Sequence, residues 1–412
     1  MNFSNSRWIR FLRLCGRKGF RPAIRKGVAK IAQKYSGSTF DVPEYLDAVW
    51  SDDQPAYLQA LPSGPLRINW ILPEISAGQG GFVNIFRTVK QLEDWGHQNR
   101  IYILGKPLRS VSSIKQLICD KYFRINAQVE EFSEAIGDSD ALIATFWPTA
   151  YAARRIGNTA RKFYFVQDLE YMFYAPGSLY ELARQTYQFG FRGITAGAWI
   201  ADVLRREFNM ECSSFGFSYD RDLYASTGSR LLPEGKKRLL FYARPETERR
   251  GFELGLLALS LVARRMPNVE LVLAGLASRS IDLPFPATCL GVLPLSRLGS
   301  LYRSCDVALV LSHTNLSLLP LELMACGCAV VSNQGPNVEW LLSRETAHLA
   351  KADPVSLADH IIDLFHSDKL RRRQIQAGLA LAETTSWTKE LRAIESALLA
   401  ARENVFQLTS NA

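Results

Sequence analysis

Short apolar runs alternate with amphipathic stretches from residue 67 onward. Runs typical of buried parallel strands lie at 67–72, 100–104, 141–145, 162–166 and 192–195. Between the first two runs, apolar residues recur at helical spacing: Phe82, Ile85, Phe86, Val89, Leu92 and Trp95. Strands that alternate with helices predict an α/β fold in which a parallel sheet is covered on both faces.

A second set of alternating elements begins near Lys237. Its expected strands are 238–242, 268–274, 306–311 and 328–332, and its expected helices are 252–266, 295–304, 319–327 and 354–366. The polar stretch 220–236 separates the two sets. Two Rossmann-like domains that face each other across a cleft are the expected architecture. A last helix at 387–404 has no strand after it, and we expect it to cross back to the first domain.

This pattern divides the chain into four parts. We expect a basic arm and linker at 1–60, a first Rossmann-like domain at 61–225, a second at 226–385, and the C-terminal helix within 386–412. A chain of 412 residues is long for a single core, which also favours two domains.

The positive charge of the chain belongs to its N-terminal arm. Residues 1–34 hold ten of the 49 basic side chains and no acidic one, which leaves 39 basic against 40 acidic residues in the remainder. A nucleic-acid-binding domain would carry its basic patch on the fold, so we expect no nucleic-acid partner.

The arm has the pattern of a helix that lies on a membrane. Over residues 6–18, Trp8, Phe11 and Leu12 fall on one side and arginines fall on the other. Aromatic rings enter the headgroup zone while arginines meet anionic lipid. Residues 1–34 are therefore expected to bind an anionic membrane surface. A solvated basic tail, or a helix packed on a partner protein, explains the same pattern.

Other features of the sequence bear on location and metal binding. Seven cysteines without a recurrent spacing are typical of reduced thiols in an intracellular protein. The basic N-terminus precedes no apolar stretch of the kind that a secretory signal needs. Asp138 and Asp140 match a metal-binding Asp-x-Asp pair, but they precede a strand instead of following one, so we expect turn residues and no metal.

Glycines follow the first strand and open the next helix at Gly80 and Gly81. Glycine lets the backbone approach a ligand closely, and free N–H groups at a helix N-terminus attract anions. A dinucleotide fingerprint would need a third glycine where Val83 stands, and an acidic residue where Gly105 and Lys106 end the second strand. An NAD site is therefore disfavoured, and a tight turn also explains the two glycines.

Arginines cluster after the first strand of the second set. Arg244 lies at the strand end, and Arg249 and Arg250 follow in the next loop. Doubly wound sheets bind ligands at the carboxyl ends of their strands, and the arginine fork fits phosphate oxygens. The arrangement predicts an anion site, while a solvated pair of arginines is the simpler explanation.

One carboxylate, Glu322, lies near the start of the expected helix 319–327. The neighbouring Leu319 and Leu321 have backbone N–H groups that a diphosphate would accept, whereas Pro320 has none. A carboxylate there can accept hydrogen bonds from ligand hydroxyls. It can also simply stabilise the helix dipole.

These segments resemble the retaining GT-B enzymes of glycosyltransferase family four. The segment 243–251 resembles their phosphate-binding segment, 293–306 their nucleotide-binding turn, and 320–331 the second half of their Glu–seven residues–Glu motif. Segments 165–174 and 241–245 look most like the bacterial S-layer rhamnosyltransferases of the WsaF type. The likeness spans about 67–385.

The resemblance implies a role for each candidate residue. Stabilisation of the departing diphosphate and catalysis fall to Arg244, Arg249, Arg250 and Asp168. Donor binding falls to Glu322, Leu319, Leu321, Leu293 and Thr314. The acceptor and phosphate loop comprises Gly80, Gly81, Gln167 and Tyr174. The chain departs from the family at Thr314, where the first Glu of the motif would stand, and at Gln167, where a histidine is common.

The reaction implied is transfer of a sugar, with rhamnose from dTDP-rhamnose as the best candidate, to a hydroxyl of a growing glycan or lipid-linked glycan. The resemblance implies retention by front-face displacement, with no cofactor and no metal, in a cytoplasmic enzyme peripheral on the inner face of the plasma membrane. A sugar isomerase or phosphorylase of the same fold and a catalytically silent scaffold are the alternatives.

Overall fold

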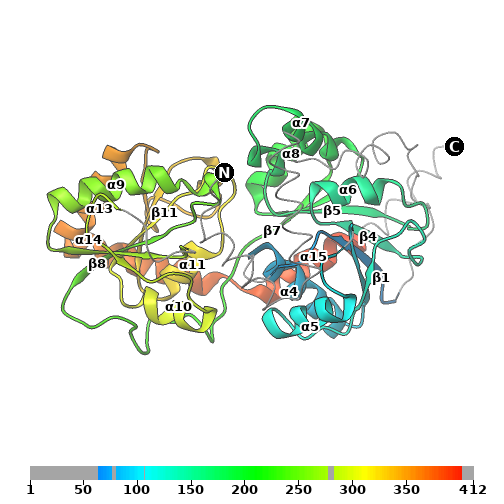
Figure 1. Cartoon of the computed structure of the whole chain (residues 1–412), viewed down its shortest axis with the longest axis horizontal. Coiled ribbons are helices and arrows are strands. Elements are labelled where there is room, and N and C mark those ends of the chain that lie inside the picture. The colour runs from blue at the N-terminus through cyan, green and yellow to red at the C-terminus, as the bar shows by residue number, and fades with distance from the viewer. Residues whose placement is uncertain (1–63, 77–79, 106, 277–282, 401–412) are drawn as a thin grey trace, which may run out of the picture.

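The computed structural model describes residues 64–76, 80–105, 107–276 and 283–400, which form two α/β lobes side by side (Figure 1). Each lobe holds one sheet whose paired strands are all parallel, with helices on both faces. The predicted α/β architecture of two Rossmann-like halves is confirmed. The basic arm and its expected helix at 6–18 lie outside the described residues.

The first lobe contains a seven-stranded sheet of order β3-β2-β1-β4-β5-β6-β7. Its elements are β1 (Arg67–Leu72), α4 (Gly80–Asp94), β2 (Gln98–Ile103), α5 (Val111–Lys121), β3 (Gln128–Glu131), β4 (Ala141–Ala144), α6 (Trp147–Arg154), β5 (Lys162–Val166), η1 (Glu170–Phe173), α7 (Ser178–Gln185), η2 (Thr186–Gln188), β6 (Arg192–Ala196), α8 (Ala198–Phe208) and β7 (Cys212–Phe215).

The second lobe contains a six-stranded sheet of order β10-β9-β8-β11-β12-β13. Its elements are β8 (Lys237–Tyr242), η3 (Glu248–Arg250), α9 (Phe252–Arg265), β9 (Val269–Ala274), β10 (Thr288–Cys289), α10 (Leu295–Tyr302), β11 (Val307–Val310), α11 (Leu319–Ala325), β12 (Ala329–Asn333), α12 (Pro336–Glu339), β13 (His348–Ala350), α13 (Pro354–His366) and α14 (Asp368–Thr384).

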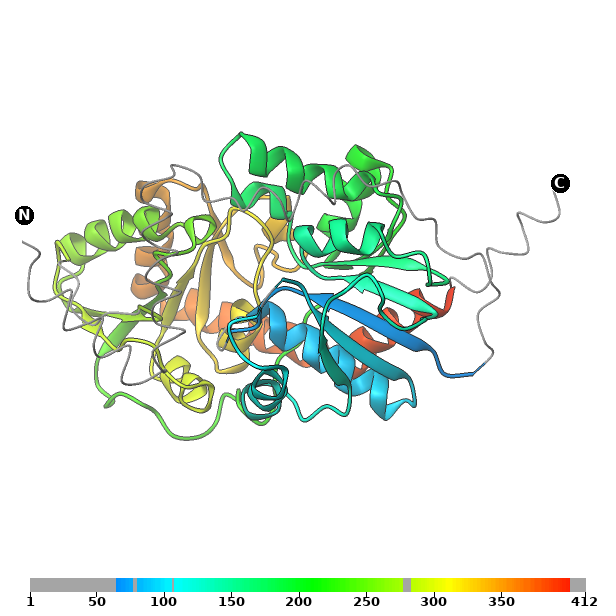
Figure 2. The same ribbon diagram turned by 45° about the vertical axis from the view of Figure 1, so that its right-hand side comes forward.

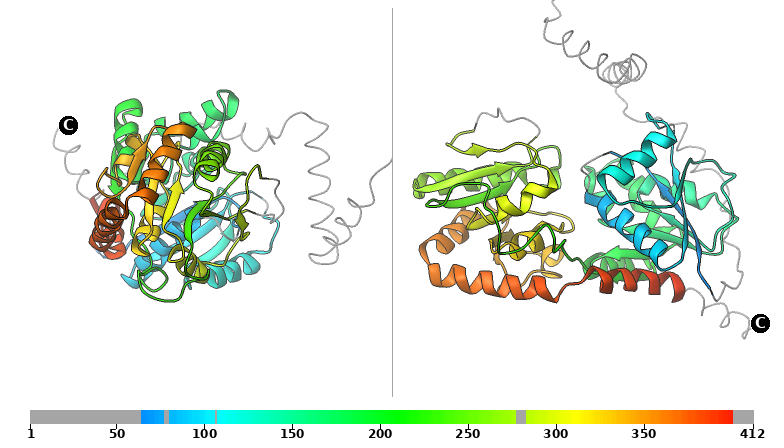
Figure 3. Two further views of the ribbon diagram at one scale, coloured as in Figure 1. Left: turned by 90° about the vertical axis from the view of Figure 1, so that its left-hand side faces the viewer. Right: turned by 90° about the horizontal axis from the view of Figure 1, so that it is seen from below.

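The last helix, α15 (Trp387–Ala400), leaves the second lobe and packs on α4 and β7 of the first. In the right-hand view of Figure 3, α14 and α15 run one after the other along the same edge of the two lobes. His97 of the first lobe lies 3.1 Å from a carboxylate oxygen of Glu395, and Arg392 stacks over Trp95 at 3.7 Å. The C-terminal segment α14–α15 therefore spans both lobes, as its orange-to-red ribbon shows (Figure 2).

One hydrophobic core is continuous between the two lobes. It includes Trp70 of β1, Phe217 of the connection between the lobes, and Leu321 of α11, and all three are buried. Phe217 meets Trp340 edge to face with ring centroids 5.3 Å apart. Each lobe has a separate core on its other face. Burial of this shared apolar surface favours a defined arrangement of the lobes.

The central strands of both sheets were predictable from sequence, whereas the edge strands were not. Strand β5, with the sequence KFYFV, is buried over four consecutive residues, as expected for a central parallel strand. The edge strand β3 reads QVEE, with three of its four residues exposed, and β10 has only two residues. Such short polar segments carry no apolar run from which to predict a strand.

A buried carboxylate lies where the first lobe approaches the second. Glu170 begins η1, is 4% exposed, and accepts hydrogen bonds from the Trp147 N–H at 2.6 Å and the Tyr164 hydroxyl at 2.8 Å. Burial outweighs these bonds and raises the pKa of Glu170 to about 8. Most of this side chain is therefore protonated at neutral pH.

Replacing Glu170 with Gln should change how stability depends on pH. Because the folded pKa of about 8 lies above the ordinary value of 4.5, the wild-type free energy of unfolding falls as pH rises between these values. Gln cannot ionise, so the variant should gain stability relative to wild type from pH 5 to 8.5, on the order of 2–4 kcal/mol. Thermal unfolding at several pH values measures this trend, with the exposed Glu345→Gln as control. A difference that does not vary with pH would contradict the assignment.

Candidate functional site

The carboxyl ends of three strands bring the candidate residues together between the lobes. Arg244 follows β8, the loop 312–315 follows β11, and Gln167 and Asp168 follow β5. Strands β8 and β11 are neighbours at the point where the order of the second sheet reverses. This is the place where doubly wound sheets bind ligands.

Asp168 joins the two lobes. One carboxylate oxygen accepts from the backbone N–H of Asn315 at 2.9 Å, and the other from the Thr314 hydroxyl at 2.9 Å. The second oxygen also lies 3.3 Å from Nε of Arg249. Asp168 is only 7% exposed. Because both oxygens are occupied, the residue is placed to position the second lobe, and a role as a free base would require these contacts to break.

The side chain of Asn315, in the second lobe, also bonds backbone groups of the first lobe. Its amide nitrogen donates to the carbonyls of Gln167 at 3.0 Å and Ala196 at 2.7 Å, and its oxygen accepts from the Trp340 indole at 3.0 Å. A Cβ at Gly197 would lie 2.8 Å from the Trp340 ring, and Gly197 has a φ of +95°. Glycine is needed there for both the conformation and the close approach.

The three candidate arginines have different surroundings. Arg250 donates through Nη1 to the Ser312 hydroxyl at 2.7 Å and to the Asn315 carbonyl at 2.9 Å, and burial lowers its pKa to about 10. It therefore braces the loop after β11 as a cation. Arg249 stacks over Phe173 at 4.0 Å, with 29% of its side chain exposed.

Arg244 is the most accessible of the three arginines. Its side chain is 38% exposed, stacks over Tyr242 at 5.3 Å, and lies 3.8 Å from Glu246 in a loose ion pair. Loose exposed pairs contribute little to stability. Arg244 therefore offers its guanidinium to a ligand at the end of β8.

Gln167 supports the glycine-containing start of α4. Its amide nitrogen donates to the Gly81 carbonyl at 3.0 Å, and its oxygen accepts from Asn84 at 2.9 Å. A Cβ at Gly81 would lie 3.2 Å from the Gln167 amide, whereas one at Gly80 meets nothing within 4 Å. The surface at Gly80 is thus open to a ligand, and Gln167 holds the neighbouring turn in place.

Glu322 lies between two tyrosines. The hydroxyls of Tyr224 and Tyr302 hydrogen-bond its carboxylate, and their rings stack at 5.8 Å. Burial, with the charge of Asp220 acting in the same direction, raises the pKa of Glu322 to about 7. Arg87 of α4 pairs with Asp220 at 2.9 Å.

The contacts of Glu322 argue against a role that is limited to stabilising the dipole of α11. Helix α11 begins after Leu318, which makes no side-chain cap hydrogen bond, and Leu319 and Leu321 lie in the first turn. The Glu322 carboxylate is held by side chains of other elements. Leu293, before α10, is partly buried and packs on the shared core, so its contribution to a ligand site would come from its backbone.

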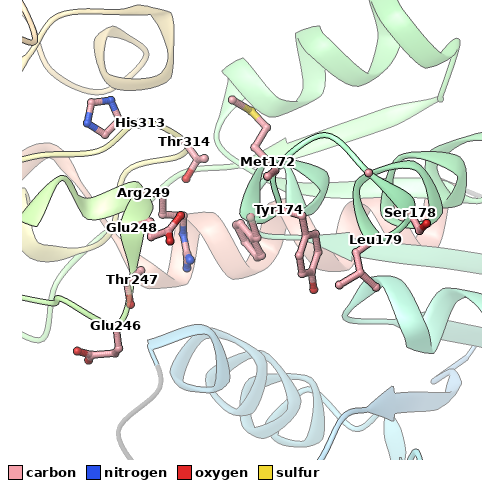
Figure 4. Close-up of a pocket in the computed structure, with 13 residues that line it drawn as sticks. Met172, Tyr174, Ser178, Leu179, Glu246, Thr247, Glu248, Arg249, His313 and Thr314 are labelled. Carbon is pink, nitrogen blue, oxygen red and sulfur yellow. The ribbon is translucent and has the colours of Figure 1, made fainter. Parts of the chain in front are cut away.

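A pocket of about 870 Å³ opens beside the contact made by Asp168 (Figure 4). One wall is the segment 172–179 of the first lobe; the other is formed by residues 246–249, His313 and Thr314 of the second. Tyr174 lies in the first wall, and its hydroxyl accepts from the Trp147 indole at 3.0 Å. The candidate residues Tyr174, Arg249 and Thr314 therefore share one cavity.

Several residues of this region were missed from sequence. Asn315 and Trp340 belong to no motif, and each matters only because the two lobes meet there. Phe173 and Glu248 lie within the resembling segments 165–174 and 243–251, but neither was singled out. For Asn315, the adjacency to Thr314 was the one available signal. Asp140, set aside as a metal ligand, accepts from the backbone N–H and guanidinium of Arg67.

The described residues contain neither a cluster of metal-ligand side chains nor a membrane-spanning helix. Over 64–76, 80–105, 107–276 and 283–400, no group of three His, Cys, Asp or Glu side chains is placed to hold a metal. In the same residues, no helix has the length and apolar character needed to cross a bilayer.

The two sheets match the two domains of one protein family. The profile of the WsaF N-terminal domain matches residues 67–196, and that of the WsaF C-terminal domain matches 237–362. The O-antigen biosynthesis protein RfbC of Myxococcus xanthus is 37% identical over 265 residues, which cover 63% of this chain and 21% of that protein. A phosphatidyl-myo-inositol mannosyltransferase of Mycobacterium tuberculosis is 31% identical over 185 residues, covering 41% and 49%. The matches thus span half or less of these relatives.

Solved structures share the fold at low identity. A glycosyltransferase of Rickettsia africae superposes with a TM-score of 0.61 at 15% identity, covering 83% of this chain and all of that one. Anabaena HepE in complex with UDP and glucose superposes with a TM-score of 0.59 at 13% identity, covering 84% and 100%. The two domain profiles together match more than half of the chain, in the order and positions of its two sheets. The chain belongs to the WsaF family and has the GT-B fold.

Proposed function

We propose that the protein is a glycosyltransferase that moves a sugar from a nucleoside diphosphate to a hydroxyl of a cell-surface glycan. The observation that carries this proposal is the placement of Arg244 after β8 and of Arg249 in the turn that follows, at the edge of the second sheet that contacts the first lobe, with Glu322 in the first turn of α11. The relative in Myxococcus xanthus is named for O-antigen biosynthesis, and Anabaena HepE has been solved with UDP and with UDP-glucose. Both names agree with a nucleotide-sugar donor.

The arginines would stabilise the negative charge that develops on the leaving group. When the bond between the anomeric carbon and the phosphate oxygen breaks, negative charge develops on the nucleoside diphosphate. Arg244 and Arg249 present exposed guanidinium surface at this place, and fixed cations in a partly desolvated cleft stabilise such charge without reorganising. Arg250 would act indirectly, by holding the loop that carries Thr314 and Asn315.

The family resemblance favours a retaining reaction, and neither Gln167 nor Asp168 is free to act as the base of an inverting one. A displacement with inversion needs a base beside the acceptor hydroxyl. Gln167 has no basicity and is bound to Gly81 and Asn84, and Asp168 is occupied by the second lobe. In front-face displacement, the acceptor oxygen bonds to the anomeric carbon as the phosphate departs. The acceptor proton then passes to the departing phosphate oxygen, and no protein base is needed.

Family resemblance favours rhamnose as the sugar transferred and thymidine diphosphate as its carrier. Thr314 replaces the carboxylate that usually contacts the sugar, and its hydroxyl faces Asp168. A donor poor in polar groups, such as a 6-deoxy sugar, suits this smaller side chain. We further propose that residues 1–34 hold the enzyme at an anionic membrane surface on the cytoplasmic side. We also propose that the first domain ends at residue 225 and the second at residue 385.

Arg244→Ala should slow sugar transfer by about 10²–10³-fold, the loss expected when one donor to a developing anion is removed. The melting temperature should change little, because Arg244 makes only a loose ion pair. Steady-state kinetics with dTDP-rhamnose measures the effect. Arg265→Ala, which also removes an exposed arginine from a surface pair, is the matched control. Wild-type turnover in Arg244→Ala would remove this residue from the mechanism.

The affinity for a nucleotide sugar should rise with pH through Glu322. Pentose hydroxyls donate to the ionised carboxylate, and with a pKa of about 7 only a minority of Glu322 is ionised at pH 6. Binding should therefore strengthen by about tenfold between pH 6 and 8. Titration calorimetry with a nucleotide sugar, whose diphosphate diester does not titrate in this range, measures the trend.

Two variants test whether Glu322 causes this dependence. Glu322→Gln keeps one acceptor and should bind with an affinity that does not change from pH 6 to 8. Glu322→Ala should lose about 1.5–3 kcal/mol of binding at pH 8. An unchanged affinity in both variants would leave Glu322 with a structural role only.

Deleting residues 1–34 should release the protein from anionic vesicles while leaving donor affinity intact. The ten basic residues supply the attraction to the membrane, and this attraction is screened by salt. Co-sedimentation with vesicles that contain phosphatidylserine measures the binding, and phosphatidylcholine vesicles are the control. Equal sedimentation of the full chain and the truncated chain would exclude the arm as the anchor.

A further inference from the structure

The pocket between residues 172–179 and 246–249 is a second binding surface beside the donor arginines. We propose that it binds the acceptor as a neutral pyranoside, and that it disfavours acceptors whose phosphate lies next to the reacting hydroxyl. This inference rests on the proposed function and adds the acceptor's place and chemical class. The pocket has a volume of about 870 Å³, which is enough for one or two sugar rings.

The first wall offers rings fixed in position. The Tyr174 hydroxyl accepts from the Trp147 indole at 3.0 Å, and the two rings meet at 89° with centroids 6.3 Å apart. Phe173 lies beneath the Arg249 guanidinium. The C–H face of a pyranose is apolar and packs on aromatic rings, and rings that are already held lose little entropy on binding. Met172, 40% exposed, extends this apolar wall.

The second wall carries carboxylates. Glu246 and Glu248 are exposed, and Glu248 forms no ion pair with any residue that the structure describes. Arg249, the cation of the lining, is partly compensated by Asp168 and by the Phe173 ring. Burial lowers the pKa of His313, which stays neutral at pH 7. Because Glu246 is loosely paired with Arg244, Glu248 is the uncompensated charge of the lining. Sugar hydroxyls can donate to it, while a phosphate close to it would be repelled.

The position of the pocket suits an acceptor. Arg249 and Thr314 line it and also contact Asp168, so it adjoins the strand ends where the donor diphosphate is expected (Figure 4). Glu322 is absent from its lining and is hydrogen-bonded instead by Tyr224 and Tyr302. The acceptor and the nucleoside would therefore occupy separate surfaces.

Ligand-observed NMR with the full chain tests this assignment without knowledge of the donor. The probes are a panel of neutral octyl pyranosides and, as the anionic alternative, dioctanoyl phosphatidylinositol, which represents the lipid named in the mycobacterial relative. We expect saturation transfer to a neutral pyranoside and at least tenfold weaker binding in Tyr174→Ala. Glu246→Lys/Glu248→Lys should bind the anionic probe at least fivefold more tightly than wild type does. Tyr174→Phe should keep most of the binding, and the exposed Glu345→Lys is the charge-matched control.

Donor titration of the same variants separates the possible failures. Unchanged affinity for dTDP-rhamnose in Tyr174→Ala, together with lost pyranoside binding, supports the proposal. Weaker donor binding in Tyr174→Ala would show that the pocket holds the donor's own sugar, which overturns it. Wild-type binding of phosphatidylinositol in preference to every neutral pyranoside would also overturn it while leaving the glycosyltransferase proposal intact. If wild type binds no nucleotide sugar at all, the proposed function fails first and the acceptor assignment fails with it.

Discussion

The Asp168 carboxylate, enclosed between two sheets, is the constraint on which the arrangement of this molecule depends. A buried charge must be fully hydrogen-bonded, because an uncompensated one costs several kcal/mol. Two hydrogen-bond donors come from the opposite lobe, the Asn315 N–H and the Thr314 hydroxyl, and Arg249 of that lobe adds an ion pair at 3.3 Å. Separating the lobes would leave the carboxylate with the Leu169 N–H of its own lobe and with water. The distance between the lobes is thus fixed at Asp168 by hydrogen-bond geometry, and elsewhere by α15 and the shared core.

This constraint explains why Arg249 and Arg250, adjacent in sequence, do different things. The turn η3 points Arg250 inward to the loop after β11 and Arg249 across to the first lobe. Gly251, with a φ of +59°, ends the turn so that α9 can begin. Phosphate binding would draw Arg249 partly away from Asp168. If Arg249 binds the departing diphosphate as proposed, the same guanidinium would serve both partners, and occupancy of the donor site would be coupled to the contact between lobes.

The central strands and the strand-end residues were predictable because they follow rules local in sequence. Buried parallel strands are continuous apolar runs, and the residue after such a run lies at the edge where ligands bind, which identified Arg244. Asp168 was identified through the family resemblance. The contact between lobes was not predictable. Asn315 bonds residues about 120 and 150 positions earlier, and Trp340 matters only because Gly197 leaves room for it. No period or propensity in the chain encodes which loops meet when two domains dock.

The threonine at position 314 is consistent with the carboxylate at position 168. Thr314 Oγ1 lies 2.9 Å from Asp168 Oδ2, inside a region where both residues are buried. A glutamate at position 314 would place a second carboxylate next to that of Asp168, with Arg249 as the nearest compensating charge. Two adjacent buried carboxylates do not both stay ionised. A hydroxyl instead donates to Asp168. In this chain the first lobe thus supplies a carboxylate at the place where the second lobe's motif would have put one, and the hydroxyl of Thr314 turns a charge repulsion into a contact between the lobes.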